Sequence, residues 1–216
     1  EYTFDNSLGD CLPTFTGIST SNYTYEDTVN DNITTRIIYT TSTKTITKIS
    51  FKGQKSLLTV SYLINTKYGD AMFSGCTNLT SIKIPNWDVA GGTTFEDMFN
   101  NCHKLESLDL SSFTSTSLIT NMATMFYSCK ALTHLNLSSF DTTNLTTANA
   151  MFRDCTSLKE LDLTSFDTSK ITNMNQMFRG TGYSSTAFTL DLGDKFDTSN
   201  VTDMTMMFYY AGYNNS

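Results

Sequence analysis

The sequence predicts an α/β solenoid of stacked repeats, with a parallel β-sheet on one face, short helical turns on the other and a β-rich N-terminal cap. A Met-Phe pair that recurs at nearly constant spacing is the first observation behind this prediction, because fixed periods of 20 to 50 residues are typical of repeat architectures. The steps between the pairs are 26, 27, 26, 26 and 30 residues. The pairs are Met72-Phe73, Met98-Phe99, Met125-Phe126, Met151-Phe152, Met177-Phe178 and Met207-Phe208.

The second observation is that other residue types recur at the same spacing as the Met-Phe pairs. A Cys lies four residues after the Met of each of the first four pairs, and a Leu-x-x-Leu-x-Leu pattern comes next. An aromatic residue then follows each Leu pattern. The cysteines are Cys76, Cys102, Cys129 and Cys155, and the aromatic residues are Trp87, Phe113, Phe140, Phe166 and Phe196.

Each repeat is predicted to contain two short elements. In Leu161–Leu163 a polar residue lies between two apolar ones, which is the period of a strand with one buried face. The apolar residues from Ile171 to Phe178 follow steps of three and four, which predicts one or two amphipathic helical turns. Between them, Asp167–Ser169 offers side-chain oxygens to nearby backbone N–H groups, as in an Asx turn. One repeat cannot bury its own apolar side, so stacking is required.

The N-terminal region does not follow the repeat. Residues 1–45 are rich in Thr and β-branched residues, and we interpret them as a β-rich cap that covers the first strand edge. Residues 46–216 then form the solenoid of about six repeats, with Ile46–Phe51 as one more strand. At Ser216, after the sixth Met-Phe pair, either a short tail serves as a cap or the chain is a segment of a longer protein, and we favour the second alternative.

Composition and charge exclude several classes of protein. The chain has 216 residues, is 39% hydrophobic and only 16% charged, and carries a formal net charge of −7. No apolar run reaches the roughly 18 residues of a transmembrane helix. The acidic balance argues against a nucleic acid or an anionic membrane as partner.

The repeat as a whole resembles a known family. The segment MFRDCTSLKELDLTSFDTSKITNM (residues 151–174) is similar to the BspA-like subgroup of leucine-rich repeats, which are bacterial surface protein repeats of about 26 residues. The chain departs from common leucine-rich repeats because Phe or Trp follows the strand instead of Asn, and from the subgroup where Thr181–Tyr183 replaces the Cys segment. The resemblance implies a right-handed leucine-rich-repeat-like array, exported to a bacterial cell surface and associated with adhesion and binding of host proteins.

The four repeated cysteines allow two interpretations. A Met four residues before each Cys could form a soft-metal ladder, since Cu(I) favours thiolate and thioether ligands. Alternatively each Cys fills the same small buried slot, and Thr181 and Ala211 at the equivalent positions favour this packing role. We therefore predict a structural cysteine ladder of free thiols, with no metal and no cofactor. The state of Cys11 stays open.

The aromatic residues after the strands are expected to stack from repeat to repeat. Phe113, Phe140, Phe166 and Phe196 would form an aromatic ladder in the core. The polar residues of the strands are instead expected to face outward on one sheet face, where parallel strands lie about 4.8 Å apart. This face is our candidate ligand-binding site, and its acidic row could also hold a cation. Its residues are Lys83, Asp109, His134, Asn136, Glu160, Asp162 and Asp191.

Enzyme signatures are weak. The chain has two histidines, His103 and His134, and lacks a Gly-rich phosphate loop or an H-E-x-x-H motif. An acid–base cluster of His134 with Asp109 and Asp162 is the one catalytic arrangement that the repeat phase would allow, and we predict no enzyme. The expected function is a non-catalytic, monomeric cell-surface module that binds a host or neighbouring-cell protein or glycan. A structural spacer and an accessory module of an exported enzyme are the alternatives.

Overall fold

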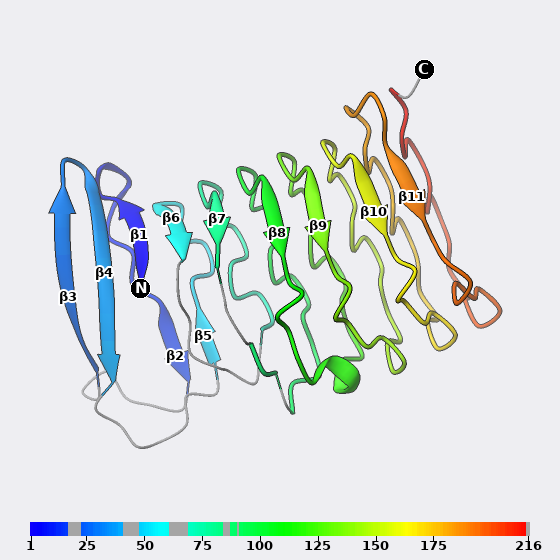
Figure 1. The fold of residues 1–216 in the computed structure, drawn as a ribbon, viewed down its shortest axis with the longest axis horizontal. Coiled ribbons are helices and arrows are strands. Elements are labelled where there is room, and N and C mark those ends of the chain that lie inside the picture. The colour runs from blue at the N-terminus through cyan, green and yellow to red at the C-terminus, as the bar shows by residue number, and fades with distance from the viewer. Residues whose placement is uncertain (17–22, 41–47, 61–68, 84–86, 90, 215–216) are drawn as a thin grey trace.

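The structure, a computed structural model, describes residues 1–16, 23–40, 48–60, 69–83, 87–89 and 91–214. The molecule is elongated, and successive segments of the chain lie side by side along its long axis (Figure 1). The strands are β1 (Tyr2–Asp5), β2 (Thr14–Thr16), β3 (Tyr23–Asn30), β4 (Ile33–Thr40), β5 (Lys48–Ser50), β6 (Leu57–Val60), β7 (Ser81–Ile82), β8 (Ser107–Asp109), β9 (His134–Asn136), β10 (Glu160–Asp162) and β11 (Thr189–Asp191). Two short 3-10 helices, η1 (Asn6–Leu8) and η3 (Thr116–Leu118), complete the elements.

The predicted α/β solenoid, a right-handed leucine-rich-repeat-like array with helical turns, is wrong. Within the described residues the helical elements are the two three-residue 3-10 helices. The strands do not form one continuous parallel sheet but several short ones, in the orders β3-β4-β1-β6-β7, β10-β11, β2-β5 and β8-β9. In the part that the structure describes, the chain is thus a small β-rich domain with almost no helix.

The N-terminal strands join the first repeats in one mixed sheet. Strand β1 pairs antiparallel with both β4 and β6, and β6 pairs parallel with β7. Buried Arg36 holds this region together: it bonds Asp27 at 2.6 Å and Asp10 at 2.9 Å, and its guanidinium lies 4.0 Å from the ring centre of Tyr25. The boundary expected between the N-terminal cap and the repeats, at residues 45 and 46, falls outside the described residues.

The expected strand at 46–51 is not part of the repeat series. Ile46 and Thr47 lie outside the described residues, and β5 pairs antiparallel with β2. The first repeat is instead Phe51–Val60, which the sequence interpretation missed. Phe51 stacks on Phe73 with ring centres 5.8 Å apart, and β6 supplies the parallel strand. The available signal was Phe51-x-Gly-x-x-x-Leu, which matches the segment from Phe73 to Leu79.

Overlapping turns occupy the positions where helices were expected. In residues 174–181 the N–H groups of Met177, Arg179 and Thr181 each donate to the carbonyl three residues earlier, at 3.1 Å. This spacing of three imitates a helical period in the sequence. A helix is excluded because two residues of each such segment have positive φ, which an L-residue adopts singly and not in helices. Examples are Gln176 at 55° and Gly180 at 66°.

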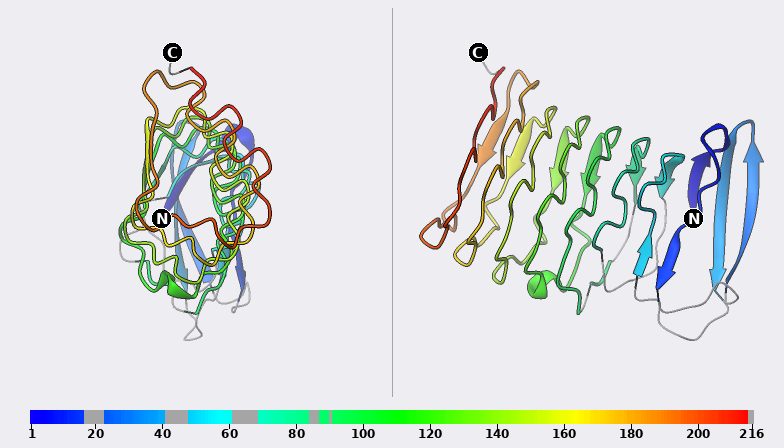
Figure 2. Two further views of the ribbon diagram at one scale, coloured as in Figure 1. Left: turned by 90° about the vertical axis from the view of Figure 1, so that its right-hand side faces the viewer. Right: turned by 180° about the vertical axis from the view of Figure 1, so that it is seen from behind.

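The alternate N–H groups of these turns join one repeat to the next. Those of Gln176, Phe178 and Gly180 donate to the carbonyls of Thr205, Met207 and Tyr209, all at 2.9 Å. The same pattern recurs in the preceding repeats. We call the stacked segments 69–76, 95–102, 122–129, 148–155, 174–181 and 204–211 the turn ribbon. It forms one wall of the molecule and the short strands form the other, as the end-on and rear views show (Figure 2).

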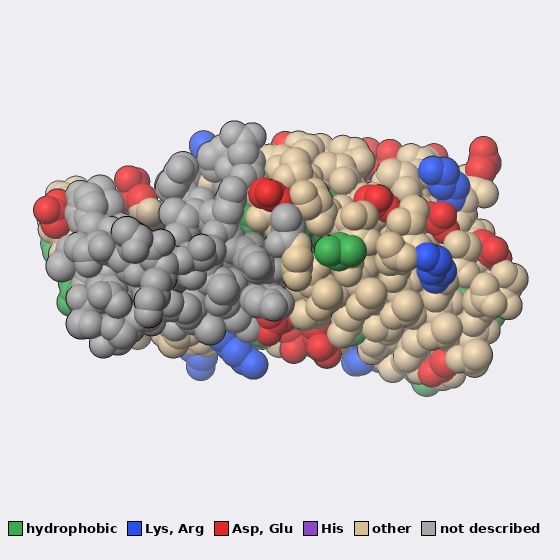
Figure 3. Space-filling view, turned by 90° about the horizontal axis from the view of Figure 1, so that it is seen from below, with side chains coloured by type: hydrophobic (Ala, Val, Ile, Leu, Met, Phe, Trp, Pro, Cys, Tyr) green, Lys and Arg blue, Asp and Glu red, His purple; other side chains and the backbone are tan. Residues whose placement is uncertain are grey.

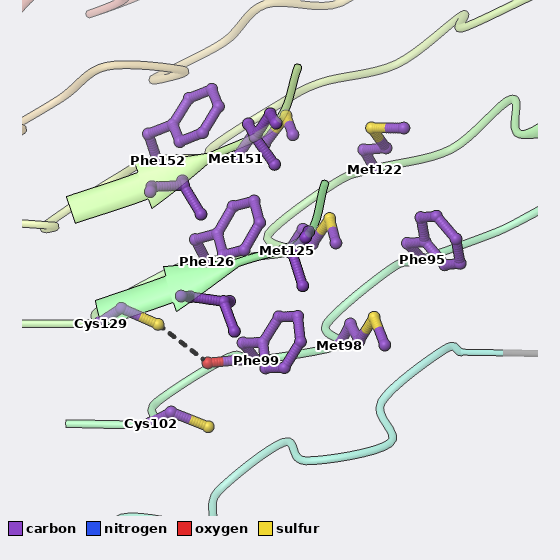
Figure 4. Close-up of a cluster of buried hydrophobic side chains, with 14 of the residues drawn as sticks. Phe95, Met98, Phe99, Cys102, Met122, Met125, Phe126, Cys129, Met151 and Phe152 are labelled. Atoms are coloured by element: carbon purple, nitrogen blue, oxygen red, sulfur yellow. Dashed lines mark hydrogen bonds between the residues drawn. The ribbon is translucent and has the colours of Figure 1, made fainter. Parts of the chain in front are cut away.

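The core lies between these two walls. The Met of each Met-Phe pair is buried, and the neighbouring Phe rings stack along the molecule with interplanar angles of 1° to 13°. Figure 4 shows how the Met, Phe and Cys side chains of adjacent repeats repeat the same orientation. The Phe stack contains Phe51, Phe73, Phe99, Phe126, Phe152, Phe178 and Phe208.

Candidate functional site

The cysteines of the predicted structural ladder are buried hydrogen-bond donors. The thiol of Cys129 donates to the carbonyl of Phe99 at 3.1 Å (Figure 4), and Cys76, Cys102 and Cys155 make the same bond to the Phe of the repeat before. Thr181 continues the series, because its hydroxyl donates to the Phe152 carbonyl at 2.8 Å. In these five repeats the slot holds a small hydrogen-bond donor, a property that the sequence interpretation as an apolar slot missed, whereas Ala211 fills the equivalent position of the last repeat without one.

The electrostatics of the thiols agree with this role. Burial raises the pKa of Cys76 and of Cys129 to about 12, and it raises the pKa of Cys102 and Cys155 well above the ordinary thiol value. All five cysteines, Cys11 included, are free. Protonated thiols are poor metal ligands and poor nucleophiles. Within the described residues no three His, Cys, Asp or Glu side chains converge as metal ligands would.

The aromatic residues after the strands stack only in part. Phe113 and Phe140 stack with ring centres 5.6 Å apart, and Trp87 is tilted on Phe113 at 4.7 Å. Phe166 is fully buried, whereas half-buried Phe196 is tilted against Phe178 at 6.4 Å. The long continuous stack is that of the Met-Phe rings instead.

The candidate strand-face residues all lie on the surface. Lys83 is exposed, and so are the two polar residues that flank the central Leu in each of β8, β9 and β10. Parallel pairing places Asp109 beside Asn136, and Asp162 beside Asp191. We define the strand face as Ser81, Lys83, Ser107, Asp109, His134, Asn136, Glu160, Asp162, Thr189 and Asp191.

The acidic row of this face also ends the strands. Asp162 accepts the N–H of Thr164 at 2.8 Å and the hydroxyl of the same residue at 2.7 Å. Asp109, Asn136 and Asp191 accept the equivalent N–H two residues later. These hydrogen bonds lower the pKa of Asp109 and Asp162. One oxygen of each of these side chains is therefore committed to a turn.

Two other members of the strand face differ from this row. Thr133 donates its hydroxyl proton to the Glu106 carbonyl at 2.9 Å, so its 2.9 Å contact with His134 requires a proton on Nδ1 of that ring. In the neutral ring the Nε2 atom is then the acceptor. Glu160, in contrast, makes no ion pair within 4 Å in the described part of the chain.

A polar hollow of about 470 Å³ adjoins the strand face at the start of β9 and β10. It lies beside the longest repeat, where 30 residues separate the Met-Phe pairs and the additional loop is fixed by backbone bonds from Gly182 to Cys155 and from Ser184 to Thr156. Sequence reasoning noted the additional length and not its consequence. The hollow is lined by Thr133, Ser157, Lys159, Ser184, Ser185, Thr186 and Ala187.

The edge below the strands carries a second acidic series. Asp141, Asp167 and Asp197 each accept the N–H of the residue two positions later, at 2.8 to 3.1 Å, which confirms the turn predicted at Asp167–Ser169 and shows it in two further repeats. Figure 3 shows that acidic side chains on the described part of this edge are scattered among polar ones. This edge offers no single patch of one charge there, so the strand face remains the candidate surface.

These features define a class of protein, namely a chain of stacked sequence repeats with polar outer walls. The chain belongs to the family described as "Mycoplasma protein of unknown function, DUF285", whose model matches residues 44–134 and again 114–216. No curated protein and no solved structure matches the chain. In the described residues, no helix has the length and apolar character needed to cross a membrane.

Proposed function

We propose that the chain is a non-catalytic binding module of a BspA-like bacterial surface protein, which contacts a host or neighbouring-cell protein or glycan through its strand face. The observation that carries this proposal is the in-register array of exposed polar side chains on short parallel strands above a closely stacked core. Such an array offers many individually weak polar contacts over a long surface. The resemblance of the repeat supports export to the cell surface.

The polar hollow strengthens the proposal at one place on the strand face. It adds a concave region with hydroxyl groups and the Lys159 ammonium next to His134 and Glu160, which begin β9 and β10. Concave polar surfaces allow a sugar or a peptide side chain to be surrounded by donors and acceptors, whereas a flat face offers contacts from one side. We therefore expect the tightest contacts between β9 and β11.

The test begins with a screen of the chain against host matrix proteins and glycans. For a partner found there, Glu160→Lys is expected to weaken binding at least fivefold, because this residue is exposed on β10 and no turn depends on its side chain. Asp194→Lys makes the same charge change off the strand face and is the matched control. Equal effects of the two substitutions, or the absence of any partner in the screen, would favour a spacer role instead.

A further inference from the structure

The turn ribbon carries a column of aromatic and basic residues that the proposed function does not use. The residue after the Met-Phe pair is Tyr127, Arg153, Arg179 and Tyr209 in four successive repeats. The guanidinium of Arg153 lies 5.0 Å from the ring centre of Tyr127, and that of Arg179 lies 5.8 Å from the ring centre of Tyr209. The two cations thus lie between two tyrosines on the wall opposite the strands.

These two guanidinium groups belong to adjacent repeats, and among the described residues only that of Arg153 has an ion-pair partner. The preceding residues, Phe152 and Phe178, stack at 5.8 Å, so the two arginines emerge about one repeat spacing apart. The Nε atoms of both are buried without a hydrogen-bond partner. Asp154 lies 3.3 Å from the Nε atom of Arg153, near enough for an ion pair but without hydrogen-bond geometry. Arg179 has no ion pair within 4 Å in the described part of the chain.

The surroundings of the column are polar, with one carboxylate, that of Asp154, beside Arg153. The residues three positions before the Phe that precedes each member of the column are buried Ala123, half-buried Asn149 and Asn175, and exposed Thr205. Amide and hydroxyl groups can both donate and accept hydrogen bonds, as the hydroxyl groups of a sugar do. The amide groups of Asn149 and Asn175 beside two cations fit a glycan, whose hydroxyl groups can bond to the amides while its anionic group meets the guanidinium groups.

We propose that Arg153 and Arg179 bind an oxyanion group, a sulfate or a carboxylate, of an acidic glycan chain that lies along the turn ribbon. Two guanidinium groups one repeat apart can share one oxyanion, and planar guanidinium groups match the geometry of such groups better than ammonium does. The bound anion would also offset the repulsion between the two cations. The site is on the wall opposite the strand face and does not depend on the proposed function of that face.

The experiment measures binding of a heparin octasaccharide and a hyaluronan octasaccharide by calorimetry at 50 and 150 mM NaCl. We expect the chain to bind at least one of them, Arg153→Gln/Arg179→Gln to weaken that binding at least tenfold, and added salt to weaken it further. Lys104→Gln/Lys130→Gln removes two positive charges from neighbouring repeats and is expected to change binding less than threefold. Inorganic sulfate and a Glu octapeptide are the comparison probes.

The proposal is overturned if neither octasaccharide binds, or if the Glu octapeptide binds as tightly as the glycan. It is also overturned if Lys104→Gln/Lys130→Gln loses as much affinity as Arg153→Gln/Arg179→Gln. Arg153→Lys/Arg179→Lys keeps the charges and the packing stems, so a loss of at least threefold in this variant would support planar recognition even if the glutamine variant unfolds. Glu160→Lys is expected to leave glycan binding unchanged, which separates this site from the strand face.

Discussion

At the scale of single residues, the repeat conserves hydrogen-bonding capacity as well as volume. The Cys thiols and the Thr181 hydroxyl occupy one slot because each is small and each donates to the Phe carbonyl of the preceding repeat. Each of these carbonyls also accepts a backbone N–H three residues later, as that of Phe126 does from Cys129 at 3.1 Å. The thiol or hydroxyl is thus a second donor to the carbonyl, and a hydrogen bond of this kind contributes roughly 0.5–1.5 kcal/mol net to the contact between repeats.

Replacement of Cys129 tests this role directly. Cys129→Ala removes one of the two donors to the Phe99 carbonyl, which keeps the N–H of Cys102 at 3.1 Å, and it is expected to lower the free energy of unfolding by about 0.5–1.5 kcal/mol. Cys129→Thr keeps a donor in the position that Thr181 occupies naturally, and it is expected to cost less than the Ala variant. Urea unfolding monitored by circular dichroism measures both. Equal losses would mean that the slot selects for size alone.

Thiol accessibility provides a second prediction at this scale. Burial raises the pKa of Cys11, Cys76 and Cys129 to about 12, so these thiols stay protonated at neutral pH. A disulfide exchange reagent at pH 8 is expected to find no reactive thiol within minutes in the native protein and five in urea without reductant. Fewer than five in urea would reveal a disulfide and contradict the free-thiol ladder.

At the scale of the elements, the two walls use different means to end a segment. The strands end in side-chain caps, in which Asp109, Asp162 and Asp191 each accept a backbone N–H two residues later. The turn ribbon changes direction through residues with positive φ, such as Ala150 at 50° and Gly180 at 66°. The strand ends depend on a side-chain acceptor, which is a carboxylate in Asp109, Asp162 and Asp191, and the turn ribbon depends on backbone conformation. A change of pH therefore tests the first and Gly substitutions test the second.

The capping carboxylates predict acid sensitivity. Hydrogen bonds lower the pKa of Asp162 and Asp109 in the folded state, so their contribution is complete above the unfolded value of about 3.9 and is lost as the pH falls below it. Asp162→Asn keeps an acceptor oxygen, as Asn136 does, without the charge. The stability advantage of the parent over this variant is expected to shrink between pH 5 and pH 2 in urea unfolding experiments. Parallel pH profiles would contradict the assignment.

The positive-φ positions predict opposite effects for one pair of substitutions. A Cβ on Gly180 would lie 2.7 Å from Oδ1 of Asp154 in an unfavourable backbone region, so Gly180→Ala is expected to cost about 1–2 kcal/mol. Ala150 already bears that strain, and Ala150→Gly is expected to be neutral or stabilising by up to about 1 kcal/mol. Thermal unfolding compares the two. Destabilisation of similar size in both would indicate that backbone strain does not limit the turn ribbon.

These elements also show which parts of the structure the sequence could predict. The Leu-Asp-Leu alternation placed Leu161 inward and Asp162 outward, because a strand has a period of two that polarity reveals. The turn ribbon was mistaken for helix, because overlapping turns also give apolar steps of three. Some of its positive φ values fall on residues such as Ala150, which do not indicate a left-handed conformation, whereas those on Gly75 and Gly180 were a signal that the interpretation missed. The polar hollow depends on where the additional loop between Met177 and Met207 lies, and the spacing of the repeats alone does not predict that position.

At the scale of the whole molecule, stability is expected to follow position in the stack. Each repeat contacts mainly its two neighbours, so a central repeat has two interfaces and the repeat at 204–211 has one. Phe126 is fully buried and stacks at 5.7 Å on both Phe99 and Phe152. Phe208 stacks on Phe178 at 5.3 Å and is 49% exposed.

Matched substitutions in the Phe stack test this dependence on position. Phe126→Ala opens a cavity that neighbours on both sides cannot fill, and it is expected to lower the free energy of unfolding by about 3–5 kcal/mol. Phe208→Ala removes a ring that is already half exposed, so a loss below about 1.5 kcal/mol is expected. Hydrogen exchange should likewise show stronger protection of the Phe126 N–H, which donates to Met151 at 3.0 Å, than of the Phe208 N–H. Similar losses of stability and uniform protection would mean that the Phe stack unfolds as one cooperative unit. The stability of a repeat would then not depend on its number of neighbours.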